Sequence, residues 1–300
     1  MTRYALAVDI GGTKLEAALV AEDGAIVDGS RTRRPTGRTA DAASLDAAID
    51  EAVAHALAAL PEGGELVGAG VGSAGPIDRA AGAITPVNMP RARGYRLADA
   101  VARAASTVVG REVTAVLGHD GGALALAEAW LGAARGSKAA LSIVVSTGVG
   151  GGFTFAGAYA PGATGNAGHL GQVRREGGLT LEEIASGPAS AAWAQAQGWT
   201  GATGEDLARD AAAGDPIARA AIERSARAVG EALADAATLV DLDVVAIGGG
   251  FSRVSDDYID LVQQALTASA VHAYSQATRV VRSGLGDEGP LIGAAALVLR

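Results

Sequence analysis

Residues 9–14 near the N-terminus read DIGGTK and place a carboxylate, two glycines, a hydroxyl and an ammonium side by side. Apolar, β-prone runs flank the segment at residues 4–8 and 15–20, which predicts a tight hairpin. Glycines allow positive φ and bring backbone N–H groups close to phosphate oxygens. We therefore expect this turn to bind a phosphate tail, with Asp9 holding a metal-bound water. An ordinary Gly-Gly hairpin is the alternative. The residues expected to bind are Asp9, Gly11, Gly12, Thr13 and Lys14.

A second segment, residues 144–153, reads VVSTGVGGGF and repeats the order strand, hydroxyl, glycines, strand. A third glycine cluster, residues 248–250, ends the apolar run 244–247, where the backbone could approach an adenine or a ribose. Two such hairpins half a chain apart predict a duplicated unit, each copy holding part of a nucleotide's phosphate tail. The residues expected to bind the nucleotide here are Thr147, Gly148, Gly150, Gly151, Gly249 and Gly250.

Residues 70–75 read GVGSAG and fit the dinucleotide pattern G-x-G-x-x-G after a predicted strand. That site also needs a helix that starts at once and an acidic residue about 20 positions further on. The following residues 76–79, PIDR, read as a turn, and Tyr95 and Arg96 lie where the acid is needed. The sequence therefore disfavours a dinucleotide site.

Asp120 follows the strand-like run 112–117 and precedes the alanine-rich helical pattern 121–131. An aspartate at such a position is typical of a helix N-cap. It also lies where the two halves of the chain are expected to meet, so a role as general base toward a hydroxyl is open. A carboxylate with a pKa of about 3.9 is a weak base for an alcohol. Phosphoryl transfer tolerates a weak base, because its loose transition state releases the proton late.

Asn166, His169 and Glu182 follow the second predicted hairpin. Amide, imidazole and carboxylate groups are good partners for sugar hydroxyls, because a hydroxyl both donates and accepts hydrogen bonds. His169 as a zinc ligand is the alternative, but the chain has four histidines and no cysteine, so partners for a metal are scarce.

The composition limits the class of protein. The chain has 300 residues, 49% of them hydrophobic, which is enough for two modest lobes. The net charge of −9 argues against a nucleic-acid partner. The lack of cysteine excludes disulfides and thiolate sites and fits a cytoplasmic protein. No signal-like segment opens the chain and no apolar run is long enough to span a membrane, so no membrane partner is expected.

Strand-like and helix-like patterns alternate, and a run of strands opens each half. This order predicts an α/β protein of two lobes with a ligand cleft between them. The first lobe opens with a predicted strand meander at residues 4–10, 14–20 and 25–33. The expected domains are residues 1–117 and 118–289, with an apolar helix at about 290–300 packing back on the first.

The motifs resemble those of the ROK family (repressors, open reading frames and sugar kinases), in order and spacing over nearly the whole chain. The resemblance implies the actin-like ATPase (ribonuclease H-like) fold, ATP and Mg²⁺ as cofactors, a sugar hydroxyl as acceptor, and commonly a homodimer. The matching positions are residues 9–14, 72–78, 120, 146–152, 168–169, 181–182, 185–187, 248–250, 286–287 and 292–295.

The resemblance also implies roles for single residues. Asp120 would be the catalytic base, and His169 and Glu182 would contact the sugar. Asn88 would lie in the loop of an Asn-containing sugar motif, and Gly75 belongs to the matched segment 72–78 beside that site.

Three departures from the family pattern concern the sugar side. His119 stands where ROK sugar kinases usually have Asn, and Asn166 stands where they usually have Glu; both positions touch the sugar in the family. The cysteine-rich zinc loop is missing, so zinc is not expected and hydrogen bonds or packing must hold that wall. A lost charge-assisted hydrogen bond is worth roughly 1.5–3 kcal/mol, or about ten- to hundredfold in affinity. We therefore expect poor use of glucose, or another sugar or a polyol.

Two classes of function remain. The first is an ATP-dependent carbohydrate kinase with Asp120 as general base, including a kinase of an uncommon sugar or polyol. The second is a non-catalytic, sugar-responsive protein of the repressor branch. Its DNA-binding helix-turn-helix would precede the first strand, which here begins within a few residues of Met1.

Overall fold

The structure is a computed structural model that describes residues 1–86 and 89–300, and it divides into two compact units. Unit 1 comprises residues 1–131, 158–167 and 287–300, and unit 2 comprises residues 132–157 and 168–286. The division falls after residue 131, whereas the sequence placed a lobe boundary near Gly118. The predicted division into functional lobes at residues 1–117 and 118–289 stays a prediction.

Unit 1 contains a five-stranded sheet in the order β3-β2-β1-β4-β7. Strands β1, β4 and β7 run parallel, and β2 and β3 are antiparallel to their neighbours. The elements of unit 1 are β1 (Arg3–Ile10), β2 (Lys14–Ala21), β3 (Thr32–Pro35), α1 (Ala42–Leu57), β4 (Glu65–Ser73), β5 (Ile77–Asp78), β6 (Ala83–Ile84), a 3₁₀ turn (Pro90–Ala92), α2 (Leu97–Val109), β7 (Ala115–His119), α3 (Asp120–Trp130), β10 (Ala158–Ala160) and α10 (Gly289–Leu299).

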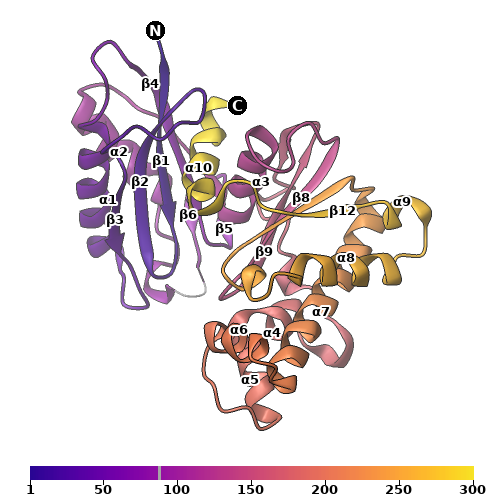
Figure 1. Ribbon diagram of the computed structural model, residues 1–300. Coiled ribbons are helices and arrows are strands. Elements are labelled where there is room, and N and C mark those ends of the chain that lie inside the picture. The colour runs from indigo at the N-terminus through magenta and orange to yellow at the C-terminus, as the bar shows by residue number, and fades with distance from the viewer. Residues whose placement is uncertain (87–88) are drawn as a thin grey trace. The chain divides into compact units, whose positions relative to one another are not determined.

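Helices cover both faces of this sheet. Successive residues along a strand point to opposite faces, so each strand contributes side chains to both layers of packing. Large apolar side chains such as Leu6 and Val8 pack with α1 and α2, whereas alanines such as Ala5 and Ala7 pack with α10. Figure 1 shows α1 and α2 on one side of the sheet and α10 on the other. The alanine face lets α10 approach closely: a Cβ added at Gly70 would lie 1.7 Å from the carbonyl oxygen of Ala294.

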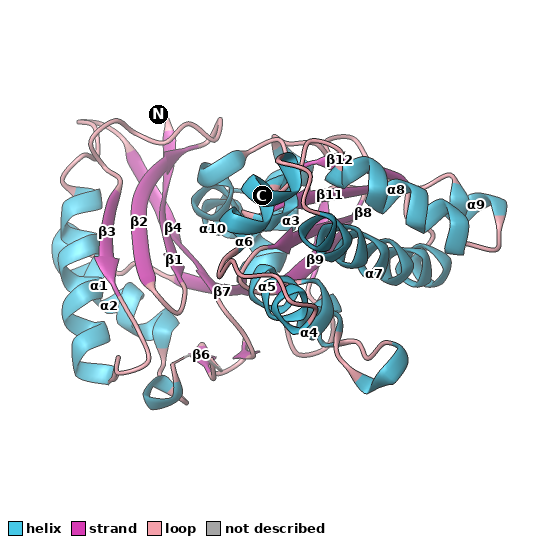
Figure 2. Cartoon of the chain, turned by 60° about the horizontal axis from the view of Figure 1, so that its bottom comes forward, coloured by secondary structure: helices cyan, strands magenta, loops and turns pink. Residues whose placement is uncertain are grey.

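Unit 2 repeats the opening of unit 1. An antiparallel hairpin, β8–β9, is followed by β11 and β12, which run parallel to β8, and the long helix α7 packs with α8. Figure 2 shows α7 and α8 side by side, as their contacts require. The elements of unit 2 are β8 (Ala139–Val145), β9 (Val149–Phe155), α4 (Leu181–Ala185), α5 (Gly187–Ala196), α6 (Gly204–Ala212), α7 (Pro216–Val240), β11 (Val244–Gly248), α8 (Tyr258–Ser269), α9 (Ala273–Gln276), β12 (Arg279–Arg282) and short 3₁₀ turns at Leu170–Gln172, Glu176–Gly178 and Phe251–Arg253.

Two predicted strands are displaced in the structure. The strand expected at residues 25–33 is instead β3, which spans Thr32–Pro35. Residues 28–30 form a turn, in which Gly29 has a φ of +75° and the Ser30 hydroxyl accepts the Leu19 N–H of β2, and Ile26 makes only an isolated bridge with Val20. The strand expected at 112–117 spans Ala115–His119, since the N–H of Val113 donates to Ser106 of α2 rather than to a neighbouring strand.

No helix among the described residues has both the length and the apolar character that crossing a membrane requires.

Candidate active site

The parallel strands of unit 1 all end at one edge of the sheet. Ile10 of β1 pairs with Ser73 of β4, and Ser73 pairs with His119 of β7. The turn after β1, the turn after β4 and the start of α3 therefore leave the sheet from the same edge. The sequence predicted functional residues in all three segments, and the sheet brings these segments together.

Asp9 lies on β1 at this edge, directly opposite Glu16 of β2 and Gly72 of β4. Gly72 packs closely on this carboxylate: an added Cβ would lie 3.2 Å from a carboxylate oxygen of Asp9. Burial raises the pKa of Asp9 to about 7, and the negative charge of Asp120 adds to the shift, while Lys14 opposes it. Carboxylate oxygens are the ligands that Mg²⁺ prefers, so Asp9 at this strand end fits the expected metal-bound water.

Asp120 is the first residue of α3, and His119 precedes it as the N-cap. One oxygen of Asp120, Oδ1, accepts the Gly121 N–H at 2.7 Å and lies 3.0 Å from Nε2 of His119. The imidazole is 2% exposed, whereas the side chain of Asp120 is 46% exposed. Among the described residues no donor lies on the other oxygen, Oδ2. One face of the carboxylate is thus fixed and the other is open to a ligand.

Lys14 begins β2 directly after the glycine turn, and its ammonium is paired with the buried carboxylate of Glu16. Arg31 and Arg33 also bond to Glu16, at 3.1 Å and 2.9 Å. Burial alone would raise the pKa of Glu16, but hydrogen bonds from Lys14 and Arg33 hold that pKa below its ordinary value. The predicted phosphate ligand Lys14 therefore belongs to a larger cationic group that the sequence analysis did not identify.

The hairpin turn itself leaves room on its outer side. A Cβ added at Gly11 would meet only the carbonyl oxygen of Lys14, at 3.8 Å. Thr36, just after β3, holds the turn in place by donating its hydroxyl to the Gly11 carbonyl and its N–H to the Thr13 carbonyl. Gly12 and Thr13 form the bend between β1 and β2.

The predicted sugar residues of unit 1 differ in their surroundings. The Asn166 side chain accepts from the Ile77 N–H at 2.9 Å and donates to the Ile77 carbonyl at 2.8 Å. The Asn166 amide thus links its own segment to the backbone at Ile77, both within unit 1. The sequence analysis did not predict this structural role. Gly75 lies in the turn after β4 and is joined to Pro76 by a cis peptide bond. Asn88 lies outside the described residues.

The second hairpin, in unit 2, is held by its backbone and by Glu182. The Ser146 N–H donates to the Gly148 carbonyl, and one oxygen of Glu182 accepts the Val149 N–H at 2.9 Å. A Cβ at Gly148 would lie 2.6 Å from that oxygen of Glu182, whereas a Cβ at Gly150 would meet nothing within 4 Å. Glu182, predicted from the resemblance to contact a sugar, therefore also fixes the hairpin.

His169 belongs to a segment that lies flat on β9. Added Cβ atoms at Gly168 and Gly171 would lie 2.2 Å and 1.9 Å from the carbonyl oxygens of Gly151 and Val149, so only glycine permits this contact. The segment brings His169 and Glu182 to the same end of β9. Between them, the loop of residues 173–181 is closed by backbone hydrogen bonds from Arg175 to Leu179 and from Leu181 to Val173. An ion pair of 2.6 Å joins Arg175 to Asp235 of α7.

A pocket of about 330 Å³ opens beside the second hairpin, wholly within unit 2. Gly249, with a φ of +95°, packs against the Val145 carbonyl at the end of β8, which places Gly250 next to Ser146. Of the predicted nucleotide residues of unit 2, Thr147 and Gly250 line this pocket, whereas Gly148, Gly150, Gly151 and Gly249 are not among its lining residues. The other lining residues, which the sequence analysis did not single out, are Ser146, Gly187, Pro188, Ala202, Thr203, Gly204, Glu205, Ala208, Phe251, Arg253 and Val254.

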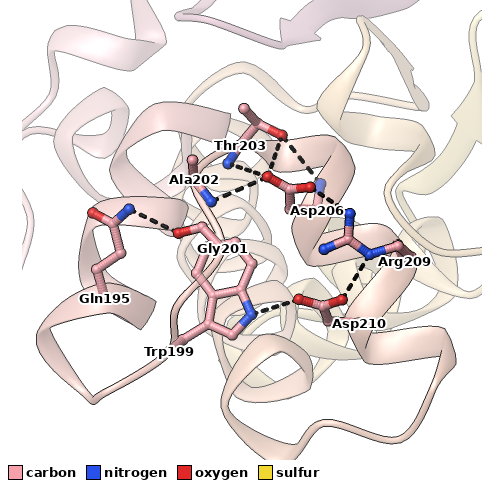
Figure 3. Close-up of polar contacts among 8 residues, drawn as sticks. All are labelled: Gln195, Trp199, Gly201, Ala202, Thr203, Asp206, Arg209 and Asp210. Atoms are coloured by element: carbon pink, nitrogen blue, oxygen red, sulfur yellow. Dashed lines mark hydrogen bonds and ion pairs between the residues drawn. The ribbon is translucent and has the colours of Figure 1, made fainter.

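One wall of this pocket is the loop before α6, drawn in Figure 3. The Asp206 carboxylate accepts from the backbone N–H groups of Ala202 and Thr203, both at 3.1 Å, and the indole of Trp199 donates to Asp210 at 2.9 Å. Thr203 and Asp206 form a capping box. The spacing T-x-x-D was a usable signal for a helix start at Gly204.

The fold and the two hairpins define a phosphotransferase of the actin-like ATPase class. The model of the ROK family matches residues 5–300, and the chain belongs to this family.

Three relatives illustrate the similarity. An N-acetylmannosamine kinase of Yersinia pseudotuberculosis is 34% identical over 262 residues, which cover 81% of this chain and 82% of that protein. The crystal structure of a ROK hexokinase from Thermus thermophilus has a TM-score of 0.81 at 30% identity and covers 98% of this chain and 97% of its own. A ROK family glucokinase from Streptomyces griseus, in complex with glucose and AMPPNP, has a TM-score of 0.79 at 28% identity, with coverage of 98% and 99%.

Proposed function

We propose that the protein is an ATP-dependent carbohydrate kinase in which Asp120 is the general base. The observation that carries this proposal is the Asp120 carboxylate, with Oδ1 held by His119 and the Gly121 N–H and Oδ2 open. A general base needs this combination of a fixed orientation and one free lone pair toward the hydroxyl. The names of the relatives, a hexokinase, a glucokinase and an N-acetylmannosamine kinase, support a sugar as the acceptor.

The reaction follows from these groups. The acceptor hydroxyl passes its proton to Oδ2 of Asp120 as its oxygen bonds to the γ-phosphorus of ATP, and the bond from that phosphorus to the β–γ bridging oxygen breaks to release ADP. The transition state is loose, so positioning and charge stabilisation contribute more than the strength of the base. Mg²⁺ near Asp9 would neutralise phosphate charge. The pocket of unit 2, with Thr147 and Gly250 in its lining, is the proposed site of the nucleoside.

The structure also bears on the acceptor. Because the Asn166 amide is already bonded to Ile77 and Thr164, we infer that it stabilises unit 1 rather than binding a hydroxyl. By the family resemblance, the residues still proposed for recognition are His119 and Gly75 of unit 1, His169 and Glu182 of unit 2, and Asn88. From the same family resemblance we infer a homodimer, which light scattering on the purified protein measures.

The test is the variant Asp120→Asn, assayed by coupled ADP release over a panel of hexoses, amino sugars and polyols. We expect turnover with every accepted sugar to fall by about 10²- to 10⁴-fold, because the amide cannot take the proton. The melting temperature should change little. The control is Asp99→Asn, since Asp99 is also an exposed first-turn aspartate, in α2.

Two outcomes would contradict the proposal. Unchanged turnover of Asp120→Asn would remove Asp120 from the mechanism. Tight binding of MgATP by the wild type with no sugar-dependent ADP release would favour the non-catalytic, sugar-responsive class.

A further inference from the structure

A cluster of charged side chains lies on β2 and the segment leading into β3, beside the first glycine hairpin. We call it the cationic cluster: Lys14, Arg31 and Arg33 around the carboxylate of Glu16. Glu16 is directly opposite Arg33 in the register of β2 with β3, and Lys14 follows the hairpin turn without a gap. The cluster therefore borders the turn itself.

The charges in the cluster do not balance. Three cations surround the Glu16 carboxylate, and Asp9 lies directly opposite Glu16 on β1, so counting both carboxylates still leaves at least one positive charge in excess in a chain whose net charge is −9. A carboxylate has about four lone-pair sites and can accept from all three cations, but each cation beyond the first adds repulsion between like charges. An arrangement that gathers three cations is explained more simply by an anion that binds to them.

The cluster is fixed on its inner side and open on its outer side. The side chain of Glu16 is 3% exposed, whereas those of Lys14, Arg31 and Arg33 are 38%, 33% and 62% exposed. Arg33 bonds to Glu16 through Nε and Nη2, and Arg31 bonds through Nη2 to Glu16 and to the Asp287 carbonyl. Each guanidinium has five N–H donors and an ammonium has three. Most of these donors have no partner within the part of the chain that the structure describes.

We propose that the cationic cluster binds a phosphate group, with Glu16 as the positioning residue that holds the three cations toward it. Guanidinium groups bind phosphate in a bidentate manner, and fixing them in advance reduces the entropy lost on binding. The ligand chemistry is a dianionic phosphate that comes either from the nucleotide or from a separate phosphate compound, such as orthophosphate or a sugar phosphate. This site does not depend on the proposed kinase activity.

The test compares the double variant Arg31→Gln/Arg33→Gln with the matched control Arg34→Gln. Arg34 lies next to Arg33 in β3, but it pairs with Glu51 of α1 at 2.9 Å and belongs to the other face of the sheet. Orthophosphate is titrated into the full chain by calorimetry at low ionic strength, without nucleotide or sugar. We expect the double variant to bind it at least about tenfold more weakly, which corresponds to about 1.4 kcal/mol, and Arg34→Gln to match the wild type.

Further arms separate the two sources of the phosphate. MgATP and a hexose 6-phosphate are titrated in the same way. A loss for orthophosphate that extends to MgATP but not to the hexose phosphate assigns the cluster to the nucleotide, and a loss that extends to the hexose phosphate but not to MgATP assigns it to a separate compound. Equal phosphate binding by the double variant, Arg34→Gln and wild type would overturn the proposal, as would the absence of phosphate binding to the wild type.

Two measurements keep the result interpretable. The melting temperature of each variant reports whether the fold is retained, and Lys14→Gln gives a second, milder removal of charge that should weaken phosphate binding in the same direction. The binding experiment does not depend on turnover. If a separate assay of ADP release showed that the protein phosphorylates no sugar, the proposed function would be disproved, and phosphate binding at the cluster would still stand.

Discussion

The two glycine hairpins have the same backbone plan and different surroundings. In unit 1, the β1–β2 hairpin is flanked by Asp9, Lys14 and Glu16, and its Gly11 has open space around it. In unit 2, the β8–β9 hairpin has no charged side chain of its own and is packed closely by Glu182 and by the segment of Gly168.

The same backbone plan is thus stabilised in two ways. In the first hairpin, carboxylates and cations flank the turn and Gly11 has space around it. In the second, Gly148 and Gly151 are closely packed, Gly150 is open, and Glu182 of α4 holds the turn. The following predictions test that contrast.

Among the tests of this contrast, the largest expected effect is that of Asp9→Asn on turnover. If Asp9 holds a metal-bound water, its loss should reduce activity and Mg²⁺ affinity by about 10- to 100-fold, as measured by ADP release at several Mg²⁺ concentrations. Asp23→Asn, in the exposed turn after β2, is the control. Equal Mg²⁺ dependence in wild type and Asp9→Asn would show that the first hairpin does not handle the metal.

The same residue makes stability depend on pH. The pKa of Asp9 is raised from 3.8 to about 7 in the folded protein. The contribution of this carboxyl group to the free energy of unfolding is therefore fully present below pH 3.8 and is lost as pH rises through about 7. We therefore expect the free energy of unfolding, measured with urea in the absence of Mg²⁺, to fall from pH 5 to pH 8 more steeply for wild type than for Asp9→Asn. Parallel slopes would contradict the assignment of this titration to Asp9.

In the second hairpin, Gly151→Ala should destabilise the protein by about 1–3 kcal/mol. The added Cβ would lie 2.5 Å from the Ser142 carbonyl and 2.8 Å from a methyl of Ile143. The neighbouring Gly150→Ala is the control, because its Cβ meets nothing, and we expect a change within about 0.5 kcal/mol. Urea unfolding measures both; similar values for the two variants would mean that the close packing of this hairpin is not what holds it.

The smallest effect is a coupling between Gly148 and Glu182. Gly148→Ala places a Cβ 2.6 Å from the carboxylate, so its cost should shrink when Glu182→Ala is also present. A double-mutant cycle should give an interaction free energy of about 0.5–1 kcal/mol. A cycle with no interaction would show that Glu182 moves aside freely and does not fix the turn.

Much of this molecule could be predicted from local patterns. The two hairpins, α2 at Leu97–Val109 and the strand ending in the third glycine cluster follow from periodicity and glycine placement. The strand expected at 25–33 was wrong, because the turn at Gly29 and the hydrogen bond of Ser30 to Leu19 override β propensity there. The family resemblance supplied the fold that periodicity could not.

The sequence by itself determined which segments are candidates for chemistry, because glycine runs next to a carboxylate or a hydroxyl are local patterns that can be read without the fold. The tertiary structure decided what each side chain does with its hydrogen bonds. It tied the Asn166 amide to Ile77, set Glu182 against the second hairpin, and gathered Arg31 and Arg33 around Glu16. These outcomes depend on strand register and on close contact between distant backbone segments, which no spacing along the chain encodes.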